Sequence, residues 1–63
     1  MAAIRDEEIE AEARAILREM IEQSGWYRGL SAAERTRRIE EDVDRNWPLM
    51  LREARRRLEH RKG

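Results

Sequence analysis

The 63-residue sequence contains no cysteine and a single histidine. Without cysteine the chain can form neither a disulfide nor a thiolate metal site. His60 cannot hold a structural zinc ion unless several carboxylates are arranged around it. The usual covalent and metal stabilisers of a very small domain are therefore excluded, and we expect no metal and no cofactor.

Long apolar runs are missing as well. The longest run covers residues 47–51 and includes a proline, whereas a membrane-spanning helix needs about 20 predominantly apolar residues. The first eight residues are acidic in character and lack the apolar stretch of a signal peptide. We expect a cytoplasmic protein without a membrane partner.

The sequence also lacks a catalytic constellation. Its few hydroxyl side chains belong to Ser24, Tyr27, Ser31 and Thr36. No histidine lies near any of them in the sequence, and no glycine-rich phosphate loop is present. A chain this short is also too thin to enclose a pocket that excludes water. We predict that the protein is not an enzyme.

Charge, by contrast, is abundant. Charged residues make up 44% of the chain, yet 14 basic and 14 acidic side chains leave a formal net charge of zero. Balanced charge, together with many strong helix formers and only one proline, favours helices over disorder. The basic residues are almost all arginine, which prefers bidentate contacts to carboxylate or phosphate groups.

A first helix is predicted for residues 4–24. Apolar side chains recur there at spacings of three and four and form one helix face: Ile9, Ala13, Ile16, Leu17, Met20 and Ile21. The helix is expected to end at Ser24, with Gly25 in the left-handed conformation and Trp26 folded back on Ile21.

A second helix is predicted for residues 31–45, after a turn with two glycines. Ser31 and Glu34 have the spacing of a capping box. The apolar stripe is narrow and consists of Ala32, Thr36, Ile39 and Val43. We expect the acidic residues of this helix to be solvated, and they would repel phosphates if it were a DNA-recognition helix: Glu40, Glu41, Asp42 and Asp44.

Pro48 leaves two architectures open. A third helix over residues 47–61 could begin with Pro48 in its first turn. Alternatively, one long helix is kinked there, because the apolar stripe keeps nearly the same phase across the proline. The break is favoured, since an internal proline costs about 3 kcal/mol.

The predicted fold class is therefore all-α. We expect a small three-helix bundle, or a helical hairpin with a Pro-kinked second arm, in a single domain over residues 1–63. Three narrow apolar stripes make a thin core, so we expect dimerisation to complete it.

The two ends of the chain carry opposite charge. Residues 1–24 hold seven acidic and three basic side chains, whereas residues 46–63 hold two acidic and six basic ones. The acidic first helix is thus expected to pack beside the basic last one, within a chain or across a dimer.

These patterns predict a small non-enzymatic protein–protein interaction or regulatory module that binds itself as a homodimer, or binds another helical protein. The expected interface comprises Ile16, Leu17, Met20, Trp26, Tyr27, Trp47, Met50, Leu51 and Leu58. The alternative is a nucleic-acid-associated regulator, against which the neutral net charge argues. Its phosphate contacts would come from Arg52, Arg55, Arg56 and Lys62.

Overall fold

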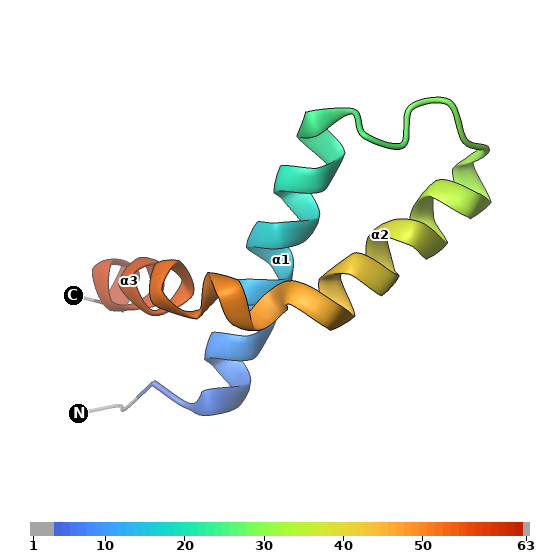
Figure 1. Ribbon diagram of the computed structural model, residues 1–63. Coiled ribbons are helices and arrows are strands. Elements are labelled where there is room, and N and C mark those ends of the chain that lie inside the picture. Colours follow the sequence, from blue (N-terminus) through green and yellow to red (C-terminus); the bar gives the residue numbers. More distant parts are fainter. Residues whose placement is uncertain (1–3, 63) are drawn as a thin grey trace.

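A computed structural model describes residues 4–62, and this part of the chain is helical with no strand. Helix α1 (Asp6–Ser24) is followed by α2 (Ala32–Asn46), a single 3-10 turn η1 (Trp47–Met50) and α3 (Leu51–Lys62). Helices α1 and α2 form a hairpin, and α3 crosses the N-terminal half of α1 (Figure 1). The all-α prediction is confirmed.

The C-terminus of α1 ends as its sequence predicts. Gly25 has φ 74° and ψ 17°, the left-handed conformation that glycine adopts without steric cost. Trp26 does not fold back on Ile21, however, and that expectation was wrong: its side chain is 71% exposed. Because the Arg28 N–H bonds to the Gly25 carbonyl and closes a tight turn, the next aromatic residue, Tyr27, packs beside Ile21 instead.

Helix α2 begins at the predicted cap. Ser31 has extended backbone dihedrals, and its Oγ accepts a hydrogen bond from the Glu34 N–H at 3.2 Å. Glu34 Oε1 accepts from the Ser31 hydroxyl at 3.2 Å, and not from the Ser31 N–H as in a full capping box, so the predicted box is only half formed. The capping interaction satisfies one of the N–H groups that the first turn of a helix leaves without a partner.

The chain changes direction between α2 and α3 through a 3-10 turn. Asn46 has φ −116° and ψ 1°, outside the helical region. Pro48 is the second residue of η1. In the first turn of a helix its missing N–H removes no helical hydrogen bond. The third helix was expected to start at residue 47, but residues 47–50 form η1 and α3 starts at Leu51.

The core consists of two small clusters on α1. One joins the N-terminal half of α1 to α3 and contains Ile9, Ala13, Ile16, Ala54 and Leu58. The other joins the C-terminal half of α1 to α2 and contains Ile21, Ile39 and Val43. Among the described residues, α2 and α3 do not contact each other. The fold is therefore an open arrangement with α1 as the shared element, rather than three helices around one core.

None of the described helices combines the length and the apolar character that a bilayer crossing requires.

Candidate protein-interaction surface

The residues predicted to form an interface lie at three different depths. Ile16 and Leu58 are each 4% exposed and belong to the chain's own core, where they hold α3 on α1. Four others are half-buried against the two core clusters: Leu17, Tyr27, Trp47 and Met50. The remaining three are exposed: Met20, Trp26 and Leu51. Only part of the predicted set is thus available to a partner.

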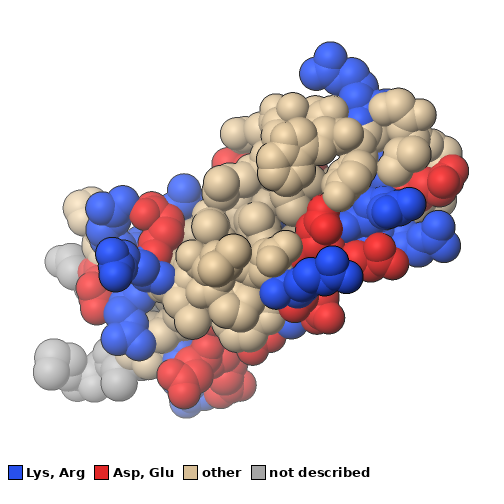
Figure 2. All heavy atoms as spheres, in the orientation of Figure 1, with Lys and Arg blue, Asp and Glu red and all other residues tan. Residues whose placement is uncertain are grey.

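Large apolar side chains are exposed on an otherwise highly charged surface. Exposed fractions are 52% for Met20, 71% for Trp26, 75% for Leu49 and 39% for Leu51. Leu49 was not predicted, although it falls off the stripe formed by Trp47, Met50 and Ala54, which was a usable sign of exposure. Figure 2 shows a broad uncharged area across the middle of one face, with charged side chains gathered along its edges.

A groove opens between the start of α1 and the start of α3, with a volume of about 710 Å³. Its floor is apolar and includes Ile9, Trp47 and Leu51. One rim is acidic and comes from α1: Asp6, Glu7 and Glu10. The other rim is basic and comes from α3: Arg52 and Arg55. We refer to this feature as the α1–α3 groove.

The indole of Trp47 is held in place from the side of α1. The Arg14 guanidinium lies 5.5 Å from the centre of the Trp47 ring, within the range of a cation–π contact. Arg14 is oriented in turn by Glu10, at 2.9 Å, and by Asp44 of α2, at 3.2 Å. One arginine therefore links α1 to α2 and to the floor of the groove.

The rims of the groove are not joined to each other. Within residues 4–62, no ion pair connects Asp6 or Glu7 to Arg52 or Arg55. Complementary charges thus face the same open groove without neutralising each other.

Elsewhere, the charges of different helices do pair. The acidic α1 lies beside the basic α3, and Arg61 donates to both Glu12 oxygens at 3.4 and 3.2 Å, so the predicted complementarity operates within one chain. The α2 carboxylates Glu40 and Asp44 were expected to be solvated. Both are exposed, as expected, but they also accept hydrogen bonds from Arg18 and Arg14 of α1. The sequence showed no sign of this pairing, since partners 22 and 30 residues apart meet only when the hairpin closes.

The contact between Arg18 and Glu40 is bidentate, with N–O distances of 2.6 and 2.9 Å. The hydrogen bond from Arg18 lowers the pKa of Glu40 below its usual value of 4.5, because the charged carboxylate is the form that accepts it. The same contact raises the pKa of Arg18. In the turn, the Tyr27 hydroxyl donates to Asp42, which raises the pKa of Tyr27 above 10.0.

Acidification is therefore expected to weaken the α1–α2 contact. Since the pKa of Glu40 is lower in the folded than in the unfolded chain, its contribution is present above pH 4.5 and is lost as the pH falls through the folded value. Arg18→Gln should cost about 1 kcal/mol or less at neutral pH, because both side chains are more than a third exposed. Thermal unfolding of both proteins should show the difference in midpoint shrinking at acidic pH. A difference that stays constant with pH would contradict this account.

The basic residues proposed as phosphate contacts do not form one site. Arg52 and Arg55 lie on the α1–α3 groove, whereas Arg56 bonds to Glu53 at 2.7 Å. Lys62 is the last residue of α3, and its side chain is outside the described part of the structure.

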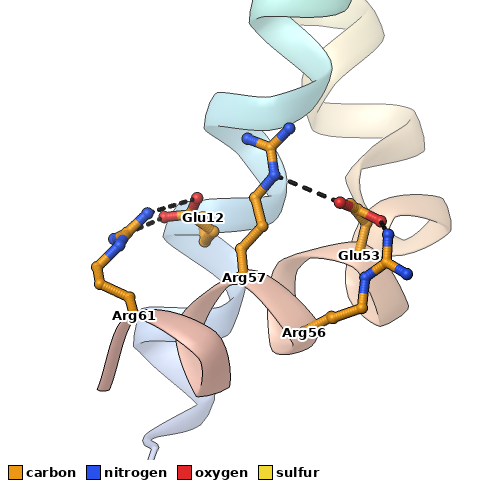
Figure 3. A network of polar contacts seen from close by, with 5 residues as sticks. All are labelled: Glu12, Glu53, Arg56, Arg57 and Arg61. Atoms are coloured by element: carbon orange, nitrogen blue, oxygen red, sulfur yellow. Dashed lines mark hydrogen bonds and ion pairs between the residues drawn. The ribbon is translucent and has the colours of Figure 1, made fainter. Parts of the chain in front are cut away.

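A network of arginines and carboxylates covers another side of α3 (Figure 3). Glu53 accepts from Arg56 at 2.7 Å and from Arg57 at 3.4 Å, while Glu12 of α1 accepts from Arg61. Together with His60, the three arginines line a shallow hollow of about 500 Å³. These carboxylates neutralise much of the local positive charge, and the bonds between Glu12 and Arg61 help to hold α3 on α1.

Comparison with protein-family models, with curated proteins and with solved structures found no match. Among the described residues, no group of three or more His, Asp or Glu side chains is placed to hold a metal ion. The surface offers exposed apolar side chains flanked by charged ones, an arrangement typical of protein–protein contacts.

Proposed function

We propose that this chain is a small protein–protein interaction module that acts as a homodimer through its exposed apolar surface and catalyses no reaction. The observation that carries the proposal is the exposure of Met20, Trp26, Leu49 and Leu51 on a surface that is otherwise dominated by charge. Large exposed apolar side chains bordered by charged ones are a feature of interaction sites.

The small size of the core supports a stable dimer as the functional form of the protein. The two core clusters are small and lie on different parts of α1. A single core in a chain of this size supplies roughly 3–5 kcal/mol, and small domains without disulfides or metals commonly gain stability from oligomerisation. A second copy of the chain would bury additional apolar surface without adding a helix to the chain.

The polar groups favour a role in binding over catalysis. The Ser24 hydroxyl donates to the Ile21 carbonyl and accepts from the Trp26 N–H, and Ser31 caps α2. Both serines are therefore engaged at helix ends. A nucleic-acid-associated role is the second candidate. It is less well supported because the formal net charge of the chain is zero and because Arg56, one of the proposed phosphate contacts, is already paired with Glu53.

The proposal predicts a dimer, with about twice the 7.6 kDa mass of one chain, at micromolar concentration. The molar mass should be measured by light scattering after size-exclusion chromatography, at low and high salt. Because dimerisation stabilises the folded state by mass action, the thermal midpoint should rise with protein concentration. A monomer at every concentration, with a constant midpoint, would exclude the homodimer.

A further inference from the structure

We propose that the α1–α3 groove is the self-interface, and that two copies related by a two-fold axis pair the acidic rim of each with the basic rim of the other. The inference rests on the homodimer proposed above and assigns it to one surface. It also names the contacts that would determine the orientation of the two copies.

The first observation is the unused charge of the rims. Asp6 and Glu7 stand on the α1 side, Arg52 and Arg55 on the α3 side, and none of these opposite charges is joined to another across the groove in residues 4–62. In contrast, α1 is joined to each of the other two helices by interhelical ion pairs. An occupant of the groove therefore has to present both signs of charge, in the opposite order.

A second copy of the groove meets that requirement. In a two-fold contact the same patch meets itself, so that if residue i contacts residue j, then j also contacts i. The Arg52 and Arg55 rim of one protomer would then lie along the Asp6 and Glu7 rim of its partner, and the reverse pair would form on the other side of the axis. Complementary charges of this kind determine register and orientation.

The floor between the rims has the composition of an interface centre. Trp47 is half-buried and Leu51 is 39% exposed. A two-fold contact would enclose the two floors between the paired rims and shield these side chains from bulk water. An apolar centre with a charged border is the usual anatomy of a protein interface, and buried tryptophan is enriched among its strongest contacts.

The hollow at the other side of α3 does not satisfy the same condition. It is lined by Arg56, Arg57, His60 and Arg61. Two copies placed there would bring basic residues against basic residues, and like charges in contact oppose association. Of the four exposed apolar residues, Leu51 lines the α1–α3 groove, whereas Met20, Trp26 and Leu49 do not. The lining of the groove therefore includes neither these three residues nor the basic hollow.

Charge reversal tests the pairing, with the dimer dissociation constant Kd measured by sedimentation equilibrium. Arg52→Glu with Arg55→Glu should raise Kd about a hundredfold or more, because each substitution acts twice in a two-fold dimer and places like charges together. Adding Asp6→Arg and Glu7→Arg to the same chain should restore Kd to within about threefold of the original value, since the rims are then exchanged but still complementary.

The control is Arg35→Glu with Arg37→Glu, which changes the net charge by the same amount at exposed positions of α2 away from the groove. Its Kd should change little. Circular dichroism establishes that each variant is folded. If the chain with four substitutions does not fold, the comparison of Kd between the Arg52/Arg55 variant and the control still tests the groove assignment. A dimer that responds equally to both double variants would overturn the groove assignment but leave the homodimer intact. A native chain that is monomeric throughout would overturn both.

Discussion

Replacing Ala13 with leucine is expected to lower the free energy of unfolding by about 1–3 kcal/mol, the usual cost of overpacking a well-packed core. Ala13 and Ala54 are both 0% exposed and belong to the cluster that joins α1 to α3. Small side chains there let the two helices approach closely, so a leucine has to push α3 away from α1. Since the whole core supplies only roughly 3–5 kcal/mol, this loss is a large part of the total.

Urea unfolding followed by circular dichroism measures this loss. The matched control is Ala15→Leu, two residues further along α1, where the side chain is exposed. It makes the same chemical change at a surface position and should alter stability by about 0.5 kcal/mol or less. Equal stability of the two variants would mean that α3 does not pack closely on Ala13.

Replacing Ile16 with alanine is expected to leave the chain largely unfolded. Truncating a buried isoleucine to alanine costs about 2–5 kcal/mol, which is comparable to all the stability that such a core provides. Ile16 is 4% exposed and contributes to the α1–α3 cluster. The far-UV signal and the urea midpoint at one protein concentration should both fall sharply.

Met20 provides the contrast, since it lies one helical turn beyond Ile16 on the same predicted stripe. Its side chain is 52% exposed. Met20→Ala should therefore cost about 0.5 kcal/mol or less. If Met20→Ala were as damaging as Ile16→Ala, then Met20 would be a core residue and the apolar surface described above would be smaller than the structure indicates.

The sequence predicted the C-terminus of α1 and the N-terminus of α2, because each depends on interactions between neighbouring residues. Gly25 ends α1 through its own backbone conformation, and Ser31 starts α2 through a hydrogen bond three residues away. The overall opposition of an acidic first helix and a basic last helix was also readable from composition. The individual ion partners were not: Arg18 and Glu40 are 22 residues apart and meet only after the hairpin closes.

The candidate site was predictable only in part. The apolar periodicity of α1 places Ile16 and Met20 on one face, but periodicity does not say how far along that face a partner helix reaches. Trp26 and Tyr27 are adjacent aromatic residues in the same turn. Trp26 is 71% exposed, whereas Tyr27 packs against the core cluster of Ile21. The acidic and basic rims of the α1–α3 groove come from opposite ends of the chain. The charge distribution predicted that these ends lie together, but not which of their residues face the groove.

The amino-acid sequence by itself determined that the protein is helical, where α1 ends and α2 begins, and that the chain has no disulfide. These properties follow from residue types and from hydrogen bonds within a turn. The tertiary structure decided the path at the end of α2, where the dihedral angles of Asn46 leave the helical region and the turn η1 directs α3 across α1. That crossing buries Ala13 and Ala54, 41 residues apart in the sequence, in one core cluster. Together with the packing of α2 on α1, it decides which apolar residues are buried and which stay exposed.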